Sequence, residues 1–482
     1  MTTTPSPRRV VIEPVTRVEG HGKVSILLDA QGNVEQARLH IVEFRGFERY
    51  VQGRPYWEMP VLVQRLCGIC PVSHHLAAAK ALDVIVGAEQ LTPTGEKMRR
   101  LMHYGQTFQS HALHFFHLVS PDLLFGFDAD PAIRHVIGVA TDPRFQALAV
   151  RGVLMRKFGQ EIIQATSGKK IHGTGAIPGG INRHLDPEVK ARFLTQIDEM
   201  VAWSQDTLEL CKGFTREHLG ELADFGTVPM SSLSIVREDG CLDLYDGDLK
   251  AVTAEGEVIF EGVAPRDYLS VIAEEVRPWS YMKFPFIRSL GPEKGWYRVG
   301  PLARMNTCTR IDTPLAEAQR AEFMAELGGG KPVNVCMAYH WARLIELLHA
   351  GEKIRELLSD PDLLSGERVV TGTRREEGFG IVEAPRGTLI HHYRVNDDDT
   401  IAMANLIVST THNNEPMNQS VSKVARDFIS GKEITEGLLN RVEVAIRAYD
   451  PCLSCATHAV GRMPLEVSLY DAEGALIDRK AT

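Results

Sequence analysis

The sequence predicts an α+β protein that is mostly helical, a single large domain with a central long-helix bundle and small peripheral antiparallel sheets. Segments with helical periodicity recur along the chain and contain few helix breakers. The strand-like segments are short and are joined by hairpin turns. No linker, repeat or low-complexity tract divides the 482 residues. One domain therefore fits better than the roughly three that length alone suggests.

Strand signals open the chain and helical signals follow. Residues 8–45 are expected to form strands, with a hairpin turn at 29–33. Residues 57–66 are apolar and are predicted to be helical, and a further helical run covers 74–87. Longer helices are expected at 94–118, 142–166 and 186–219. The last of these begins at Asp186-Pro187, an N-cap residue followed by a proline that fits the first turn.

The second half of the chain alternates in the same way. A small β-meander is expected at 241–262, where Asp246-Gly247 and Glu255-Gly256 supply the turns. Further strands are expected at 378–410. Helices are expected at 314–328, 338–358, 417–430 and 435–448. The last helix ends before Asp450-Pro451, because proline cannot continue a helix.

The composition is that of an ordinary globular protein, with 44% hydrophobic residues, 24% charged residues and a net charge of −9. It excludes a disordered chain and a disulfide-dense secreted scaffold. A mildly acidic chain gives no support for nucleic-acid binding. No segment reaches the roughly 18 uninterrupted apolar residues that a membrane helix needs. The first 18 residues lack the apolar core of a signal peptide, so a cytoplasmic location is expected.

The cysteines carry the clearest chemical signal. Cys211, Cys241, Cys308 and Cys336 stand alone and are expected to be buried thiols. The other four form two Cys-x-x-Cys pairs near opposite ends of the chain, Cys67 with Cys70 and Cys452 with Cys455. Two thiolates at this spacing can converge on one metal, and two pairs give a four-thiolate site. Such a site selects zinc, iron–sulfur, copper(I) or nickel-type centres over magnesium or calcium.

Three kinds of site remain open on these residues alone. Zinc ribbons usually place their pairs about 15–20 residues apart, which does not match two pairs at the ends of a large chain. A thioredoxin-like redox site would explain only one of the two pairs. A catalytic metal site buried between elements from both ends of the chain is favoured, and the other two stay as alternatives.

The two cysteine motifs resemble those of a known family. Residues 65–74 read Arg-Leu-Cys-Gly-Ile-Cys-Pro-Val-Ser-His, and residues 450–458 read Asp-Pro-Cys-Leu-Ser-Cys-Ala-Thr-His. Together they are similar to the paired signatures of nickel–iron hydrogenase large subunits. Further matching segments are Arg17-Val-Glu-Gly-His21, Phe44-Arg-Gly-Phe-Glu48, Ile177-Pro-Gly-Gly180, Gly300-Pro-Leu-Ala-Arg304 and Ala384-Pro-Arg-Gly387. Within the family, the stretches 42–48, 279–285 and 447–458 are most similar to cytoplasmic, bidirectional NAD-reducing hydrogenases.

The resemblance implies a nickel–iron centre whose iron carries CO and cyanide ligands. All four thiolates would bind nickel. Cys70 and Cys455 would also bridge to iron, while Cys67 and Cys452 would be terminal ligands of nickel. The metals and their diatomic ligands then carry the hard chemistry, and the protein orients and tunes them.

The resemblance also implies roles in the heterolytic cleavage of H2. Cys452 would be the first proton acceptor and Glu19 the next, since burial can raise a carboxyl pKa toward neutrality. Arg386 would lie over the nickel–iron pair. Asp450 would pair with Arg386 or fix the turn that carries Cys452.

Other residues are implied around the metals. His74 and Pro385 would contact the cofactor, and Ser409 or Thr410 would donate a hydrogen bond to a cyanide. Many family members have proline before the donor, whereas this sequence reads Val408-Ser-Thr-Thr411, so the choice between Ser409 and Thr410 stays open. A second site, holding magnesium or iron, would use three ligand residues, Glu48, the backbone carbonyl near Leu406, and His458. His111, His114 and His117 share a helical face but fall outside these motifs, and they are expected to pack.

The resemblance divides the chain into a catalytic domain, 1–458, and a C-terminal extension, 459–482, that a maturation endopeptidase would remove. The extension also reads as a β-hairpin. H2 and protons would be the substrates. The lone cysteines are too scattered to bind a cluster, so a small subunit with iron–sulfur clusters is an expected partner. A flavin-containing diaphorase module would bind FMN and handle NAD.

Three alternative interpretations remain. The quinone-site subunit of respiratory complex I shares the family's fold but lacks the metal cysteines, all of which are present here. A non-enzymatic, zinc-stabilised scaffold would keep them. A different hydrogenase of the same family would pass electrons to NADP, a deazaflavin or sulfur, because partner subunits choose the acceptor.

Overall fold

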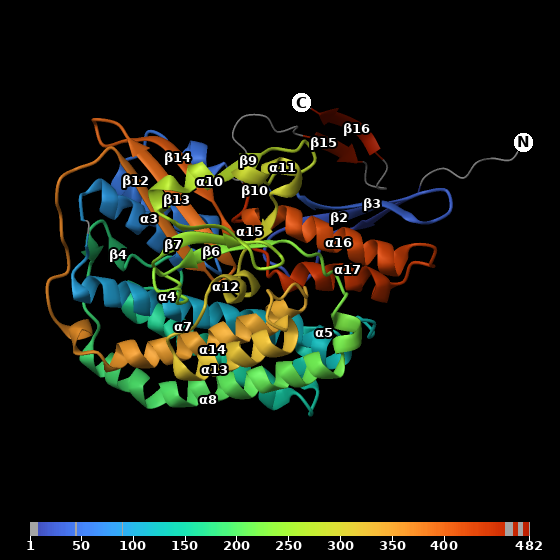
Figure 1. Cartoon of the computed structure of the whole chain (residues 1–482), viewed down its shortest axis with the longest axis horizontal. Coiled ribbons are helices and arrows are strands. Elements are labelled where there is room, and N and C mark those ends of the chain that lie inside the picture. The colour runs from blue at the N-terminus through green and yellow to red at the C-terminus, as the bar shows by residue number, and fades with distance from the viewer. Residues whose placement is uncertain (1–7, 44–45, 89, 458–465, 471–475, 482) are drawn as a thin grey trace, which may run out of the picture.

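The structure is a computed structural model that describes residues 8–43, 46–88, 90–457, 466–470 and 476–481. For the last two segments it describes the backbone alone. Across these residues, no helix is both long and apolar enough to cross a membrane. Figure 1 shows that long helices fill one side of the molecule and that most strands lie on the other side.

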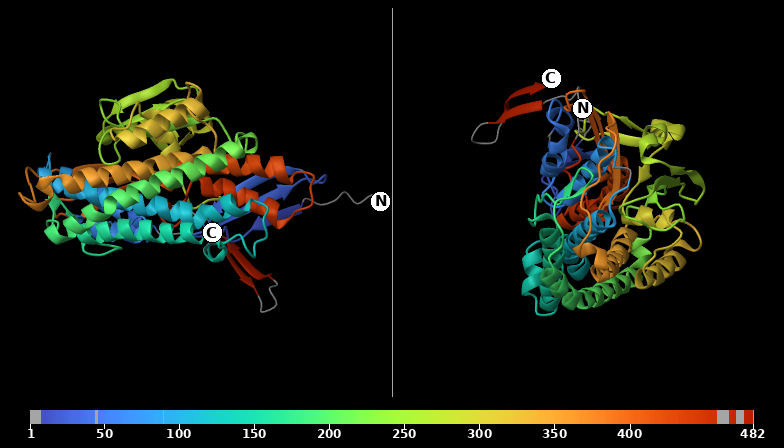
Figure 2. Two further views of the ribbon diagram at one scale, coloured as in Figure 1. Left: turned by 90° about the horizontal axis from the view of Figure 1, so that it is seen from below. Right: turned by 90° about the vertical axis from the view of Figure 1, so that its left-hand side faces the viewer.

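Long helices pack side by side to form the bundle. Its main members are α4 (Pro93–Leu113), α7 (Gln146–Ser167), α8 (Pro187–Glu217) and α14 (Ala338–Ser359). Helix α4 contacts α7 and α14, and α14 contacts α8, in agreement with Figures 1 and 2. Helix α14 is buried on most of its surface, with Trp341 fully enclosed, so its sequence shows little amphipathic pattern. The predicted fold class is confirmed.

Small sheets cover the other side. One antiparallel sheet has the order β1 (Arg8–Ile12), β2 (Gly22–Leu28) and β3 (Val34–Ile41). A second has the order β12 (Glu377–Ala384), β13 (Gly387–Val395) and β14 (Ile401–Ile407). In the third, β11 (Tyr297–Arg298) pairs in parallel with β6 (Ser231–Val236), followed by β7 (Asp248–Val252) and β8 (Val258–Val263). Two-stranded pairs are β4 (Ala176–Ile177) with β5 (Gly180–Ile181), β9 (Ile272–Glu275) with β10 (Phe284–Ile287), and β15 (Glu466–Tyr470) with β16 (Leu476–Ala481).

Shorter helices connect these layers. They are α1 (Phe47–Tyr50), α2 (Met59–Leu62), α3 (Pro71–Ile85), α5 (Ser120–Phe125), α6 (Val136–Thr141), α9 (Leu219–Leu222), α10 (Tyr268–Val271), α11 (Gly291–Lys294), α12 (Pro301–Thr307), α13 (Pro314–Phe323), α15 (Ser409–His412), α16 (Asn414–Ile429) and α17 (Glu436–Ala448). The 3-10 turns are η1 (Tyr56–Glu58), η2 (Val63–Leu66), η4 (Pro265–Asp267), η5 (Arg288–Leu290) and η7 (Pro361–Leu364), and η3 (His114–Val119) and η6 (Met324–Gly328) are π-helical.

The packing of α3 on β12 positions the site. Both surfaces are made of small residues, with alanines along α3 and glycines on β12. A Cβ atom at Gly380 would lie 2.0 Å from the Ala77 carbonyl oxygen, so only glycine allows this close approach. The start of α3 carries Cys70 and the end of β12 leads to Arg386. This contact therefore fixes two parts of the site relative to each other.

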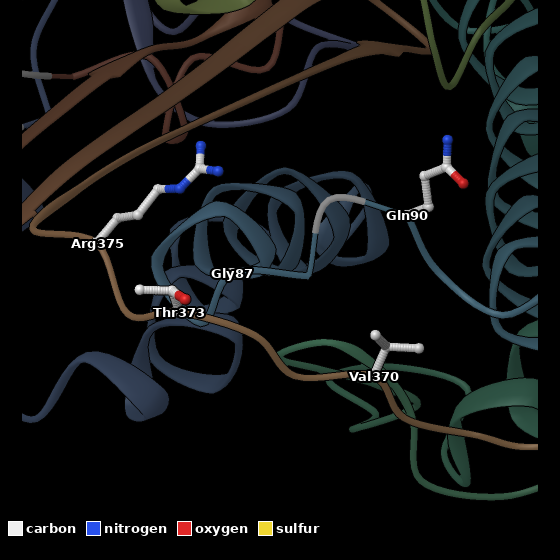
Figure 3. Close-up of a pocket in the computed structure, with 5 residues that line it drawn as sticks. All are labelled: Gly87, Gln90, Val370, Thr373 and Arg375. Atoms are coloured by element: carbon white, nitrogen blue, oxygen red, sulfur yellow. The ribbon is translucent and has the colours of Figure 1, made fainter.

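The far end of α3 lies away from the site. Gly87 has a φ of 72°, and a Cβ atom there would lie 2.3 Å from the Thr373 carbonyl oxygen. Gly87 and Thr373 line a surface hollow with Gln90, Val370 and Arg375 (Figure 3). The helix between the hollow and Cys70 spans about 22 Å, at 1.5 Å per residue.

The structure differs from the sequence-based expectations at three elements. Residues 57–66 form three short turns rather than one helix, because Pro60 lacks the N–H needed to continue it. The helix expected at 94–118 changes to a π-helix, η3, before Pro121 in the first turn of α5. The expected meander at 241–262 has its first strand earlier, at β6, whose six residues are all buried and so show no alternation.

Candidate metal centre

The four cysteines of the two motifs meet in the middle of the molecule. Their sulfur atoms all lie within 4.8 Å of one another, and all four side chains are buried. The Cys67 and Cys452 sulfurs are 3.2 Å apart, and those of Cys70 and Cys455 are 3.7 Å apart. No other group of three or more His, Cys, Asp or Glu side chains with this geometry occurs among the described residues. The two ends of the chain thus build one four-thiol site.

Local structure presents the first pair. Cys67 follows η2, and Cys70 is the residue that precedes α3. The backbone N–H groups of Ile69 and Cys70 donate to the Cys67 sulfur, at 3.1 and 3.2 Å. The start of α3 also favours negative charge close to Cys70. A short stretch of chain therefore both forms the turn and stabilises thiolates within it.

Contacts with distant residues present the second pair. The chain leaves α17 and turns at Asp450, whose φ of 53° is unusual for a residue other than glycine. The Cys452 N–H donates to the Thr410 hydroxyl at 2.9 Å. The Leu453 N–H donates to the Glu19 carbonyl at 2.9 Å, so the N-terminal segment lies alongside this turn.

Glu19 points at the second pair. The Cys452 thiol donates to Glu19 Oε2 at 3.0 Å, and the Ser454 N–H donates to the same oxygen at 3.1 Å. The Ser454 hydroxyl donates to the other oxygen. Burial raises the pKa of Glu19, and the nearby Cys67 thiolate raises it further. A carboxyl with a raised pKa, in contact with a sulfur, is suited to accept and release a proton.

Arg386 lines a cavity together with Cys70 and Cys452. It donates to Asp450 Oδ1 at 2.9 Å and to the Ser110 hydroxyl at 3.3 Å, and both charged side chains are at most 3% exposed. Asp450 thus contacts Arg386 and also lies in the turn before Cys452.

A small cavity adjoins the cysteines. It is lined by Cys70, His74, Pro385, Arg386, Leu389, Val408, Ser409, Thr410 and Cys452. The residues that the sequence predicted to contact the cofactor all line this cavity. His74 also makes a contact of 3.2 Å between its Nδ1 and Nε2 of His391. The Ser409 hydroxyl donates to the Gly387 carbonyl at 2.7 Å, whereas the Thr410 hydroxyl accepts the Cys452 N–H.

The residues present fit a nickel–iron group. Burial raises the pKa values of Cys452 and Cys455 well above their usual range. Burial also acts to raise the pKa of Cys67, but hydrogen bonds from the neighbouring thiols outweigh it and lower this pKa well below its usual value. The set can become four thiolates only if cations replace the protons. Arg386, which lines the cavity, and Asp450, which contacts Arg386, have buried Nε and Oδ2 atoms without a hydrogen-bond partner, as expected of a site that holds a further polar group.

The expected second site is only partly described. Glu48, in α1, is 2% exposed, and its Oε1 accepts the Leu406 N–H at 2.9 Å. Lys283 lies 3.6 Å from the same oxygen and 3.3 Å from Glu274. Burial raises the pKa of Glu274. His458 lies outside the described residues. Carboxylate oxygens of this kind suit a hard cation such as magnesium.

Sequence reasoning missed several residues of the site. Ser454 lies inside the second motif and could have been found as a hydroxyl next to the cysteines. Leu389 and Val408, which line the cavity, gave no such signal, nor did Ser110 and His391, which contact Arg386 and His74 respectively only in the folded chain. His111 and His114 contact Glu346 and the Arg447 carbonyl, at 3.0 and 2.8 Å, in keeping with the packing role expected for them.

The fold and the four-thiol site define the large chain of a metal-dependent oxidoreductase, and comparisons with known proteins give the family. The family described as "Nickel-dependent hydrogenase" matches residues 45–131 and 235–458, and a "HoxL-like" family matches residues 9–44. The chain belongs to the nickel-dependent hydrogenase family and is a nickel–iron hydrogenase large subunit.

Individual relatives match over nearly the whole chain. The beta subunit of the NAD-reducing hydrogenase HoxS of Cupriavidus necator is 48% identical, over 98% of this chain and 99% of that protein. A chain of the F420-non-reducing hydrogenase of Methanothermobacter thermautotrophicus is 42% identical, over 98% and 99%. A crystal structure of an NAD+-reducing [NiFe]-hydrogenase in the H2-reduced state is 56% identical, with a TM-score of 0.92, over 94% of this chain and 100% of that one.

Proposed function

We propose that this chain cleaves H2 reversibly at the four-cysteine site and that its electrons reach NAD through partner subunits. The observation that carries the proposal is the set of four buried sulfurs within 4.8 Å, with the Glu19 carboxyl 3.0 Å from the Cys452 sulfur. When bound, a nickel–iron group would supply the metals that polarise H2 and take up its electrons. The remaining steps belong to side chains of this protein.

The four cysteines would hold nickel, and Cys70 and Cys455 would also hold iron. The cavity beside Cys70 and Cys452 would take the CO and cyanide ligands of the iron. Thr410 is the better cyanide donor. A hydroxyl has one hydrogen to donate, and that of Ser409 is already given to the Gly387 carbonyl. Thr410 uses its oxygen to accept the Cys452 N–H, which leaves its hydrogen available.

The proton would move from the Cys452 sulfur to Glu19. The 3.0 Å contact allows direct transfer, and the raised pKa brings the carboxyl closer to the working pH. Arg386 would keep a positive charge beside the cavity, because the pKa of a guanidinium paired with Asp450 stays well above its usual value despite burial. Asp450 would orient this guanidinium.

Partner subunits would carry the electrons away. The lone cysteines Cys211, Cys308 and Cys336 are buried in separate places, and burial raises their pKa values to between about 11 and 12. Such thiols are poor cluster ligands. We therefore include two partners, a flavin-containing module that handles NAD and an iron–sulfur small subunit. The Cupriavidus necator relative is one subunit of an NAD-reducing hydrogenase, which favours partner subunits that pass electrons to NAD, and the proposal places the complex in the cytoplasm.

The proposal also covers maturation and the second metal. Residues 459–482 would be removed by an endopeptidase. One observation favours this: β15 and β16 project from the body of the molecule as a hairpin (Figure 2). Glu48, the Leu406 carbonyl and His458 would hold magnesium or iron.

Metal analysis of the complex from its native source tests the proposal. Nickel at about one per chain, with excess iron and H2-dependent reduction of NAD, would support it. Zinc without nickel would overturn it in favour of a structural scaffold. Reduction of NADP, a deazaflavin or sulfur in place of NAD would overturn the assigned acceptor alone. The variant Thr410→Val should shift the infrared cyanide stretches, whereas Ser409→Ala should leave them nearly unchanged.

A further inference from the structure

A buried carboxylate joins the two segments that carry Glu19 and Cys452. Asp122, in α5, accepts hydrogen bonds from Arg17 at 2.9 and 2.6 Å, one to each carboxylate oxygen. Arg447, at the end of α17, donates to the same carboxylate at 3.0 Å. The Asn440 amide adds a fourth bond at 3.2 Å. The side chains of Asp122 and Arg447 are 2% and 1% exposed, so water does not replace these contacts.

Each arginine lies close in sequence to one of the two residues of the proton-transfer contact, Glu19 or Cys452. Arg17 lies two positions before Glu19, and its φ of 55° is one that a residue other than glycine keeps only when tertiary contacts hold it. Arg447 lies in the last turn of α17, just before the turn to Cys452. Arg447 also reaches the N-terminal segment, donating to the Thr16 carbonyl at 3.0 Å and to its hydroxyl at 2.9 Å. Asp122 therefore holds two segments from opposite ends of the chain.

The charges explain why the carboxylate matters. Asp122 lies between two guanidinium groups, and Glu443 is the other acid that contacts Arg447, at 3.1 Å. Loss of the Asp122 charge would leave the buried guanidinium of Arg447 beside the partly buried one of Arg17, with Glu443 as the remaining carboxylate. Breaking a buried ionic cluster in this way is strongly unfavourable, and the segments would move apart to relieve it.

We propose that Asp122 is a positioning residue for proton transfer, which sets the distance between the Glu19 carboxyl and the Cys452 sulfur. The inference rests on the proposed role of Glu19 and Cys452. The hydrogen bond from the Leu453 N–H to the Glu19 carbonyl, at 2.9 Å, transmits any shift of one segment to the other. A displacement on the order of 1 Å at a reacting pair is enough to slow a step severely.

The test compares two reactions of the intact hydrogenase complex. Conversion of para-hydrogen to ortho-hydrogen requires H2 cleavage at the metals but no exchange with water. Formation of HD from D2 in ordinary water also requires protons to pass between the site and the solvent. We expect Asp122→Asn to lower the ratio of the second rate to the first about tenfold. The metal content and the infrared CO and cyanide stretches should stay unchanged.

A matched control separates positioning from stability. Asp83 and Arg99 form a similar buried pair, with two hydrogen bonds at 2.6 and 3.0 Å, but neither contacts the segments of Glu19 or Cys452. Asp83→Asn should lower thermal stability without changing the rate ratio. Asp122→Glu, which keeps the charge, should restore part of the ratio. If Asp122→Asn does not mature, Arg17→Lys replaces it, since lysine keeps the charge but loses the two-pronged contact.

Glu19→Gln distinguishes the inference from the proposed function. If Glu19→Gln leaves the ratio unchanged, the proposed proton route is wrong and the role of Asp122 falls with it. If Glu19→Gln lowers the ratio but Asp122→Asn and Arg17→Lys do not, the positioning role alone is wrong. If both residues act on one step, the double variant Glu19→Gln/Asp122→Asn should be no slower in HD formation than Glu19→Gln.

Discussion

The two halves of the metal site are built in different ways. The turn of Cys67 and Cys70 is closed by its own backbone N–H groups and by the start of α3. The turn of Cys452 and Cys455 depends on Glu19 and Thr410, which come from distant parts of the chain. The contacts to the Cys67 sulfur are thus local, although Gln106 and Gln109 also donate to the Ile69 carbonyl, each at 2.9 Å. The second half exists only when several segments are correctly packed. Substitutions that break the contacts between distant segments in the second half should therefore disturb metal loading.

Loss of a sulfur ligand should have the largest effect and should not distinguish the halves. Cys67→Ser and Cys452→Ser should each lower nickel content and H2 oxidation by more than about 100-fold, because removing even a supporting residue costs roughly 10- to 100-fold. Metal analysis and H2-dependent dye reduction measure this. Cys308→Ser, at a buried cysteine outside the site, is the control and should keep nickel. A Cys67→Ser enzyme that retained nickel would contradict the four-ligand site.

Alanine substitutions at two glycines, one beside each turn, should have different effects in the two halves. Gly20 has a φ of 81°, and a Cβ atom there would lie 2.6 Å from the Ser454 nitrogen. Gly20→Ala should therefore cost about 3 kcal/mol, from backbone strain and steric overlap, and should reduce nickel content.

Gly68, between the first two cysteines, has no atom near its Cβ position. Gly68→Ala should change the free energy of unfolding by no more than about 0.5 kcal/mol. Denaturant unfolding of the full chain measures the free energy of unfolding of each variant, and metal analysis measures its nickel content. Equal effects of the two variants would show that the halves do not differ as proposed.

Acidification should disturb the surroundings of the first half. Burial lowers the pKa of His75, in α3, to about 4, and its ring contacts the Pro60 carbonyl at 2.6 Å and the Ala176 N–H at 2.9 Å. In the unfolded chain His75 binds a proton near pH 6.5, and in the folded chain it does not. The stability contributed by the buried, neutral His75 ring is therefore fully present above about pH 6.5. It is lost as the pH falls from about 6.5 to 4, by about 3 kcal/mol for the one group. Unfolding curves of the full chain across this range, compared with His75→Gln, should show a weaker pH dependence in the variant.

A smaller effect than that of His75 is expected at Thr410. Thr410→Val leaves the buried Cys452 N–H without an acceptor and should lower the free energy of unfolding by about 1–2 kcal/mol. Thr410→Ser keeps the hydroxyl and should lose less than half of that. Thermal unfolding of the metal-free full chain measures both without reference to activity. If valine and serine were equally stable, the Cys452 turn would not depend on Thr410.

Sequence reasoning reached the long helices more reliably than the elements between them. The length and periodicity of the segment that became α8 were sufficient. The break at Pro60 and the π-helix before Pro121 depend on single residues within otherwise helical patterns. Strand β6 is buried on both faces and so lacks the alternation by which strands are recognised.

The sequence by itself determined the cysteine pairs, their nearest motif residues and the helical bundle, because residue type, spacing and periodicity are local properties. Only the tertiary structure decided that Asp122 holds Arg17 and Arg447 together, that Ser110 contacts Arg386, and that Leu389 and Val408 line the cavity. It also favoured Thr410 over Ser409. These depend on which atoms meet across segments far apart in the chain, and packing of the whole chain sets those distances.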